Sequence, residues 1–149
     1  MDFRKANKED LPSIVCLLAD DKLGAERERY EEPLPTVYQE AFQAIESQHG
    51  NQVILAVDGE TILGCFQLII IPGLSRQGMK RAQIEGVRVN RQHRGKGIGE
   101  QLLKKAIAIA KDEQCGLVQL TTDKQRADAQ RFYEKLGFTA SHEGMKLVL

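Results

Sequence analysis

The chain has 149 residues, with 42% hydrophobic and 28% charged side chains, which is typical of one globular domain and unlike a disordered or fibrous protein. Its 21 basic and 21 acidic residues cancel, which is not the charge profile of a general nucleic-acid-binding protein. The longest apolar runs, 54–57 and 68–71, are too short to span a membrane, and the charged N-terminus predicts no secretory leader. We therefore expect a single cytoplasmic domain, residues 1–149, that binds neither nucleic acid nor membrane.

The first third of the chain predicts one strand and two helices. A short strand surrounds Phe3, and the side chain of Asn7 can cap the helix that follows. The charged segment 20–35 is expected to form a loop, and a second helix spans about 36–48. The apolar contacts expected of these helices are Ile14, Val15, Leu17 and Leu18 in the first and Val37, Phe42 and Ile45 in the second.

The middle of the chain predicts a meander of strands. Strands at 52–57 and 61–71 flank Asp58-Gly59, a dipeptide typical of two-residue hairpin turns. The loop 72–78 then leads into a strand at 81–89. Gly86 within this strand indicates a bulge or a close approach of another backbone.

The C-terminal half alternates helices and strands. Apolar residues recur with the helical period from 97 to 114, a strand follows at 117–121, a helix at 127–136 and a final strand at 145–149. The strand–helix–strand unit 81–121 should be parallel and right-handed. The order predicts an α/β (α+β mixed) fold: a central, mixed, largely antiparallel sheet flanked by helices on both faces.

The cysteines and histidines indicate no metal or disulfide. Cys16, Cys65 and Cys115 are odd in number and about fifty residues apart, and the three histidines lack metal-ligand spacing. We interpret the cysteines as reduced core thiols and predict no metal.

The strongest local signal is RGKGIG, Arg94 to Gly99, between a predicted strand and an amphipathic helix. Its glycines leave the backbone amides accessible, and the helix adds the positive end of its dipole. The loop is therefore expected to bind phosphate or pyrophosphate, the alternative being a tight turn. Neither a Walker nor a GxGxxG pattern is present, although Asp123, roughly 24 residues further on, leaves a nucleotide-binding oxidoreductase as an alternative.

Two motifs in succession resemble the GNAT superfamily of N-acetyltransferases. The first is RxxGxG, formed by Arg94, Gly97 and Gly99, and the second, about thirty residues later, is RFYEKLGF at 131–138. The resemblance implies a GNAT-like fold and transfer of the acetyl group of acetyl-CoA directly to a primary amine of a small molecule, peptide or protein. It also allows a homodimer.

The resemblance assigns the binding of acetyl-CoA mainly to backbone groups. The amides from Arg94 to Gly99 would hold the pyrophosphate, and the bulged strand would pair with the pantetheine arm. Arg126 stands where the family often has an asparagine and could instead bind CoA phosphates. The implied cosubstrate-binding residues are Val87, whose amide would polarise the acetyl carbonyl, Val89, Arg94, Gly95, Lys96, Gly97, Ile98, Gly99 and Arg126.

The resemblance also implies two catalytic residues. Tyr133 would protonate the departing thiolate, the alternative being a packing role. Glu85 would accept the amine proton, the alternative being an ion pair with Arg81 or Arg88. His142 is a further candidate base.

Two functional alternatives also follow from the sequence. The acidic residues between 20 and 32 could attract a cationic amine or could form a solvated surface. The glycine loop would equally serve a non-catalytic module that senses acyl-CoA.

Overall fold

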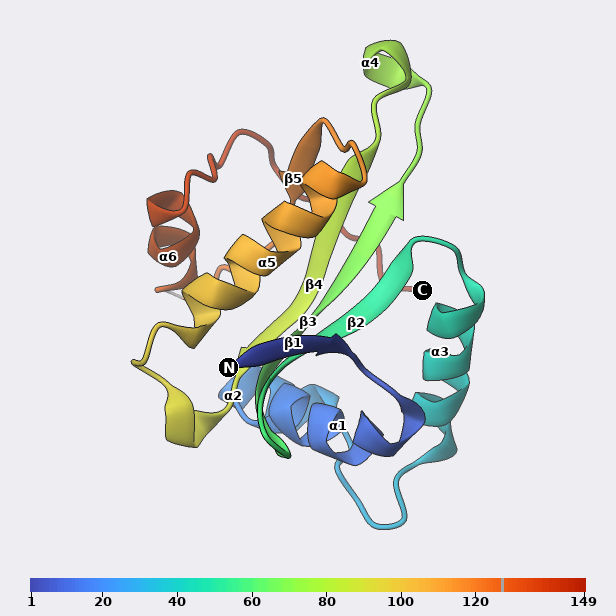
Figure 1. The fold of residues 1–149 in the computed structure, drawn as a ribbon, viewed down its shortest axis with the longest axis vertical. Coiled ribbons are helices and arrows are strands. Elements are labelled where there is room, and N and C mark those ends of the chain that lie inside the picture. The colour runs from blue at the N-terminus through green and yellow to red at the C-terminus, as the bar shows by residue number, and fades with distance from the viewer. Residues whose placement is uncertain (127) are drawn as a thin grey trace. The chain divides into compact units, whose positions relative to one another are not determined.

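The computed structural model describes residues 1–126 and 128–149 and divides into two compact units, Met1–Gln119 and Leu120–Leu149. The first unit contains a five-stranded sheet whose strands lie side by side in chain order (Figure 1). The first four strands pair antiparallel and the fifth lies parallel to the fourth, which confirms the predicted mixed sheet. The strands are β1 (Asp2–Lys5), β2 (Asn51–Asp58), β3 (Thr61–Ile71), β4 (Arg81–Val89) and β5 (Leu117–Gln119).

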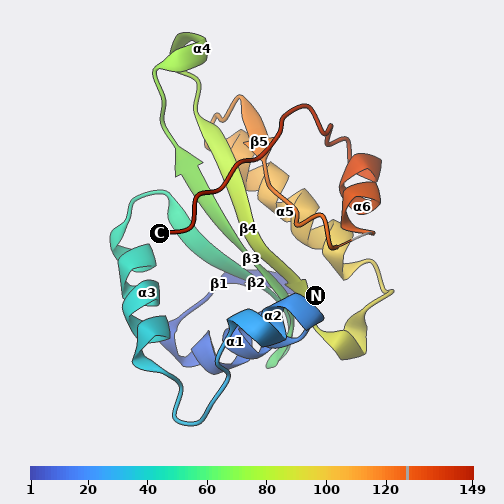
Figure 2. The same ribbon diagram turned by 180° about the vertical axis from the view of Figure 1, so that it is seen from behind.

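Helices cover both faces of this sheet, as predicted (Figures 1 and 2). In Figure 1, α5 lies in front of the sheet, and in Figure 2 α1 and α2 lie in front of the opposite face. The helices are α1 (Leu11–Ala19), α2 (Lys22–Arg27), α3 (Thr36–Ser47), α4 (Ser75–Gly78) and α5 (Ile98–Asp112), with short 3₁₀ turns η1 (Lys8–Asp10) and η2 (Arg91–His93). Within the described residues, no helix is both long and apolar enough to cross a lipid bilayer.

The core lies on both faces of the sheet, because the strands alternate their side chains between α1 and α5. Facing α1, one cluster joins the helix to the sheet through Ile14, Leu17, Leu55, Val57 and Cys65. The buried stripe of α5 follows the predicted helical period and consists of Ile98, Leu102, Leu103, Ala106 and Ala110. Packing from two sides therefore fixes β3 and β4, and with them the segment that joins β4 to α5.

The expected bulge in β4 is confirmed. Its flanking pairs with β3 are Gln67–Glu85 and Cys65–Arg88. Between these pairs β3 has one residue and β4 has two, Gly86 and Val87, which is the arrangement of a bulge. Gly86 has a φ of +60°, a conformation that glycine adopts without steric cost.

Several N-terminal details differ from the sequence prediction. Segment 20–35 is not wholly a loop, because the side chain of Asp21 accepts a hydrogen bond from the Gly24 N–H (2.6 Å) and caps α2. Val37 is 60% exposed instead of packing inward, whereas Phe42 is buried as predicted. Cys16 is exposed and so is not a core thiol, unlike the buried Cys65.

The β2–β3 hairpin turn is displaced by one residue. Asp58 pairs with Thr61, so the two loop residues are Gly59 and Glu60 instead of Asp58 and Gly59. Gly59 has a φ of +58°, as a two-residue hairpin turn requires.

The second unit contains α6 (Ala129–Lys135), which ends in a Schellman motif. The Phe138 N–H bonds to the Tyr133 carbonyl (3.1 Å) and the Gly137 N–H to the Glu134 carbonyl (3.0 Å). Gly137 adopts the left-handed φ of +96° that this ending uses. The helix was expected from residue 127, which lies outside the described residues.

The C-terminal strand expected at 145–149 is not formed, so this prediction is wrong. Met145 is 94% and Leu147 is 86% exposed, and no strand is assigned to this segment. A strand exists only with a pairing partner, whereas an apolar run identifies no such partner.

Candidate functional site

On its outer side, β4 has a strand partner over only part of its length. On this side β5 pairs with residues 81–83 only. From Glu85 to Val89, no strand of the described chain pairs with β4 on this side, because β5 ends at Gln119. This stretch includes the bulge and leaves the N–H groups of Val87 and Val89 without a strand partner, whereas their carbonyls accept from the side chains of Arg88 (2.8 Å) and Arg94 (3.3 Å).

Immediately after this edge, the chain forms the predicted glycine loop and enters α5. Gly97 is the N-cap residue of α5 and forms no side-chain cap. The first backbone N–H groups of a helix have no partner within the helix, so those of Ile98 and Gly99 are suited to an anion. Gly95 and Gly97 both have a φ of +78°, and a Cβ at either position would meet no atom within 4 Å. The loop is therefore shaped by its backbone and has open space beside it.

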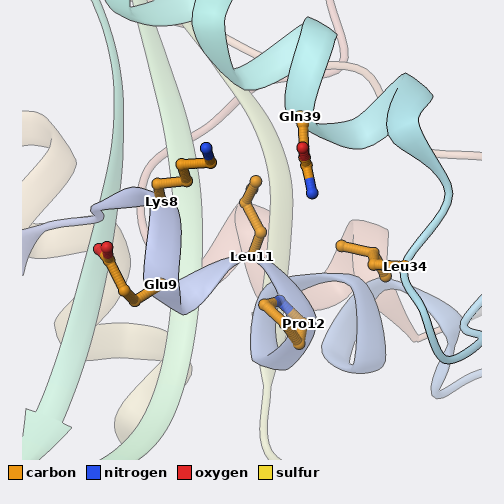
Figure 3. A pocket seen from close by; sticks show the side chains of 6 residues that line it. All are labelled: Lys8, Glu9, Leu11, Pro12, Leu34 and Gln39. Carbon is orange, nitrogen blue, oxygen red and sulfur yellow. The ribbon is translucent and has the colours of Figure 1, made fainter.

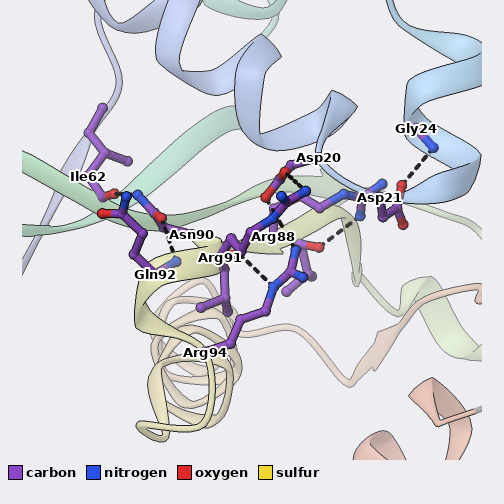
Figure 4. Close-up of polar contacts among 11 residues, drawn as sticks. Asp20, Asp21, Gly24, Ile62, Arg88, Asn90, Arg91, Gln92 and Arg94 are labelled. Carbon is purple, nitrogen blue, oxygen red and sulfur yellow. Dashed lines mark hydrogen bonds and ion pairs between the residues drawn. The ribbon is translucent and has the colours of Figure 1, made fainter.

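The start of the loop is held by a carboxylate from α1 (Figure 4). Asp20, at the C-terminal end of α1, lies 2.5 Å from an Arg91 nitrogen and 3.5 Å from an Arg94 nitrogen. The Nε–H of Arg94 also donates to the Val89 carbonyl (3.3 Å). The guanidinium of Arg94 is thus directed toward Asp20 and β4, which leaves anion binding at this residue to its backbone.

A second anchor lies at Asn90. Its N–H donates to the Leu63 carbonyl (2.8 Å) and its side-chain amide to the Ile62 carbonyl (3.2 Å). Its side-chain oxygen accepts from the Gln92 N–H (3.0 Å), which caps η2. The segment between β4 and the glycine loop is consequently fixed at both ends.

Glu85 is exposed on β4, next to the bulge. Its Oε1 accepts a hydrogen bond from the Gln83 amide (3.1 Å), and the Gln83 oxygen accepts one from the Gln119 amide (2.7 Å). The alternative ion pair with Arg81 or Arg88 is not formed in the part of the chain that the structure describes. The carboxylate therefore remains available to a proton donor.

Tyr133 lies within the second unit on α6 and is half-buried. Its ring packs edge-on against Phe132 (centroids 5.2 Å apart) and Phe138 (5.9 Å). The contact with Phe138 is the apolar contact that often accompanies a Schellman motif. The helix ending thus fixes the ring of the tyrosine through its local neighbours.

The other predicted site residues differ in how exposed they are. Lys96 is exposed in the loop, and Arg126 is half-buried just before α6. His142 is exposed and its Nδ1 lies 2.7 Å from the Ser141 hydroxyl oxygen. Among residues 1–126 and 128–149, no three potential metal ligands gather, and the expected absence of a metal stays a prediction.

The buried thiol of Cys65 is unsuited to nucleophilic attack at neutral pH. Burial raises the pKa of Cys65 to about 12, although the nearby Arg88 lowers it in part. Because the thiolate is the nucleophile, this cysteine is inert near pH 7. Its Sγ instead lies 3.7 Å from the Gly86 carbonyl at the bulge.

A surface hollow of about 280 Å³ lies elsewhere, between η1, the start of α1 and α3 (Figure 3). None of the predicted site residues lines it. The lining residues are Lys8, Glu9, Leu11, Pro12, Leu34 and Gln39. The candidate site is therefore a strand edge followed by a helix N-terminus, not this hollow.

The acetyltransferase (GNAT) family model matches residues 18–138, which include the bulged strand, the glycine loop and α6. The chain belongs to the GNAT family. Among solved structures, a transcriptional regulator from Bacillus halodurans C-125 is 53% identical, with a TM-score of 0.96 over 99% of both chains.

Two curated relatives match shorter segments. A glucosamine 6-phosphate N-acetyltransferase from Trypanosoma brucei brucei is 35% identical over 59% of this chain and 58% of its own length. An N-alpha-acetyltransferase 30 from Xenopus laevis is 33% identical over 56% of this chain and 30% of its own length. The matched segments thus span less than two thirds of these relatives.

Sequence reasoning identified the glycine loop but missed the residues that hold its surroundings. Asp20 and Asn90 are ordinary polar residues near helix and strand ends, and neither has a motif. Gln119 acquires its contact with Gln83 only through the parallel register of β4 and β5, whereas Gln83 bonds to Glu85 two residues further along the same strand. The one available signal in the sequence was the two-residue spacing of Gln83 and Glu85, which places both side chains on one face of a strand.

Proposed function

We propose that this chain is an acetyl-CoA-dependent N-acetyltransferase that transfers the acetyl group directly to a primary amine of a small molecule, peptide or protein. The observation that carries the proposal is the continuous stretch from Glu85 to Gly99, in which a bulged strand edge without a strand partner leads into a helix N-terminus without a side-chain cap. This stretch offers backbone groups first to an extended arm and then to a diphosphate. GNAT enzymes use acetyl-CoA, a molecule with both parts.

The binding of acetyl-CoA is proposed to rest on backbone groups. Val87 and Val89 pair with the pantetheine arm, and the amides of residues 94–99 hold the pyrophosphate. Lys96 and Arg126 add charge-assisted hydrogen bonds to phosphates. The open space beside Gly95 and Gly97 fits this role, because side chains there would obstruct access to the amides.

In the proposed reaction, the amine nitrogen forms a bond to the thioester carbonyl carbon and the carbon–sulfur bond breaks, with the electron pair leaving on sulfur. The Val87 amide stabilises the oxygen on which negative charge develops, a contribution of about 3 kcal/mol for one well-placed donor. Tyr133 supplies the proton that the departing thiolate takes up. No acyl-enzyme is required, consistent with the buried, inert thiol of Cys65.

Glu85 is proposed to accept the proton of the incoming amine, with His142 as the alternative base. An alkylammonium with a pKa near 10.4 is only about one part in 10³ neutral at pH 7, so the amine must lose a proton to react, and a carboxylate beside it can take that proton up. Glu85 supports this role because it is exposed beside the bulge and forms no ion pair in the described chain. The cytoplasmic location and the homodimer stay predictions.

An acetylation screen tests the function. The protein is incubated with acetyl-CoA and a panel of small-molecule amines, peptides and lysine-containing proteins, and products are read by mass spectrometry together with free-thiol release. We expect acetylated amine and thiol in equal amounts for at least one acceptor. Coenzyme A binding without thiol release from any amine would instead support the alternative, a non-catalytic acyl-CoA sensor.

A further inference from the structure

Three polar side chains form a hydrogen-bonded row across β5 and β4. Gln119 of β5 pairs in register with Gln83 of β4, and Glu85 lies two residues further along the same face of β4. The row runs from the Gln119 amide to the Gln83 oxygen (2.7 Å) and from the Gln83 amide to Glu85 Oε1 (3.1 Å). It ends at the carboxylate assigned above as proton acceptor.

The chemistry of the groups fixes the direction of this row. An ionised carboxylate can only accept hydrogen bonds, so Gln83 must present its NH₂ group to Glu85. The oxygen of Gln83 then faces Gln119, whose own NH₂ group must donate to it. Each amide is therefore held in one orientation, and Gln83 cannot turn without losing a bond at both ends.

The cross-strand neighbour of Glu85 on β3 is not part of this hydrogen-bonded row. Gln67 of β3 is directly opposite Glu85 in the register, but its amide donates to the Asn51 side-chain oxygen (2.9 Å). Oε2 of Glu85 forms no hydrogen bond or ion pair in the described chain. One carboxylate oxygen is thus fixed by the protein, while the other stays open to a proton donor.

We propose that Gln83 is a positioning residue for Glu85 and that Gln119 holds Gln83 in place. The row orients the carboxylate so that Oε2 faces the incoming amine. The neutral amide of Gln83 does this without a cationic side chain that would compete with the amine for the same oxygen. This inference rests on the proposed role of Glu85 and extends it to two residues that do not touch the substrates. Gln83 and Gln119 should consequently affect turnover and leave coenzyme A binding unchanged.

A double-mutant cycle tests this coupling. Gln83→Met removes the amide while keeping similar side-chain length, and we expect kcat to fall about threefold, against about tenfold for Glu85→Gln. The double variant should be no slower than Glu85→Gln alone, because Gln83 acts only through that carboxylate. Turnover is measured with the best amine from the screen, and the KM for acetyl-CoA should stay unchanged.

Gln67→Met is the matched control. It makes the same substitution on the same sheet, directly opposite Glu85, but removes an amide bonded to Asn51. We expect its kcat to equal that of the wild type. If Gln83→Met folds poorly, Gln119→Met can be used in its place. It removes only the hydrogen bond that Gln83 accepts from Gln119, and it should also lower kcat, by a smaller factor.

The inference is overturned if Gln83→Met has wild-type kcat, or if its loss persists in full in the Glu85→Gln background. Wild-type turnover of Glu85→Gln would refute the catalytic role of the carboxylate, and a screen without any acetylated amine would refute the proposed function. Crystal structures of the wild type and Gln83→Met test positioning without turnover. An unchanged Glu85 carboxylate in the variant would contradict the proposal.

Discussion

The starts of η1 and α5 differ in how their unpaired backbone N–H groups are satisfied. At η1, which leads into α1, the Asn7 side chain accepts from the Glu9 N–H (3.1 Å). The Asp10 carboxylate accepts from the Asn7 N–H (2.8 Å) and from two nitrogens of Arg4 (2.7 and 2.9 Å). At α5, the corresponding N-cap residue is Gly97, which has no side chain to offer.

The difference shows where an external anion is expected. At η1 the chain supplies its own acceptors, the Asn7 side-chain oxygen and the Asp10 carboxylate, so these N–H groups are paired and the turn is stabilised. At α5 the chain supplies glycines and open space, so these amides are left to solvent or to the ligand proposed above. The glycine-rich start of α5 supports the anion site proposed above, whereas the start of η1 is stabilised by the chain's own side chains.

The largest expected effect comes from giving α5 a carboxylate of its own. Gly97→Asp should weaken coenzyme A binding by about 100-fold, because the new charge occupies the anion site and repels the diphosphate. Gly97→Asn is the matched neutral variant and should lose only about tenfold, since its side chain competes for the amides without repulsion. Asp and Asn tolerate left-handed backbone better than other non-glycine residues.

Calorimetric titration with coenzyme A measures both Gly97 variants, and thermal unfolding serves as the control for folding. Equal affinities of Gly97→Asp and the wild type in a folded protein would mean that the diphosphate binds elsewhere.

Replacing Tyr133 separates binding from chemistry. Tyr133→Phe should lower kcat by about tenfold or more while changing coenzyme A affinity by less than about threefold, because only the transferable proton is lost. The ring contacts with Phe132 and Phe138 remain available to phenylalanine. Steady-state and titration measurements check this expectation.

Phe138→Leu is the matched control for Tyr133, since it removes a ring contact but keeps the hydroxyl group. It should lower the unfolding temperature more than Tyr133→Phe and reduce kcat less. The reverse order would indicate that Tyr133 has only a packing role.

The smallest expected effect is on the free energy of unfolding and concerns Asp10, at the capped start of η1. The hydrogen bond from Arg4 is the main reason that the pKa of Asp10 lies below its usual value, and the Asn7 amide lowers it further. A lowered carboxyl pKa stabilises the fold above the unfolded value near pH 4, and this contribution is lost as the pH falls through the folded value. Asp10→Asn should therefore cost about 1 kcal/mol at pH 7 and progressively less below about pH 4.

Chemical denaturation of the wild type and Asp10→Asn at several pH values measures this difference. Glu31→Gln is the control, because Glu31 pairs with Arg29 on the exposed surface and should have no measurable effect. A difference for Asp10→Asn that stays constant down to pH 3 would contradict the assigned cause.

Features encoded locally could be predicted from the sequence. Gly86 indicated the bulge and RGKGIG the helix start, because glycine's backbone freedom has a direct structural consequence. The stripe of α5 followed from its period. Asp21 also carried a local signal, because it is an N-cap residue before a short helix. The many charged residues around it made this signal hard to recognise.

Features that depend on register or partners could not be predicted. The contact of Gln83 with Gln119 requires the parallel pairing of β4 and β5, and no property of either residue specifies that alignment. The exposed positions of Cys16 and Val37 depend on which side of each helix packs inward. The failure of 145–149 to form a strand likewise depends on its neighbours rather than on its composition.

The early end of β5 also has a cost for the free protein. Unpaired strand edges are templates for another chain, so the stretch of β4 that β5 leaves uncovered invites self-association. A ligand that lies along this edge shields it and stabilises the native state by mass action. Concentrated solutions stored with coenzyme A should therefore aggregate more slowly than solutions of the free protein.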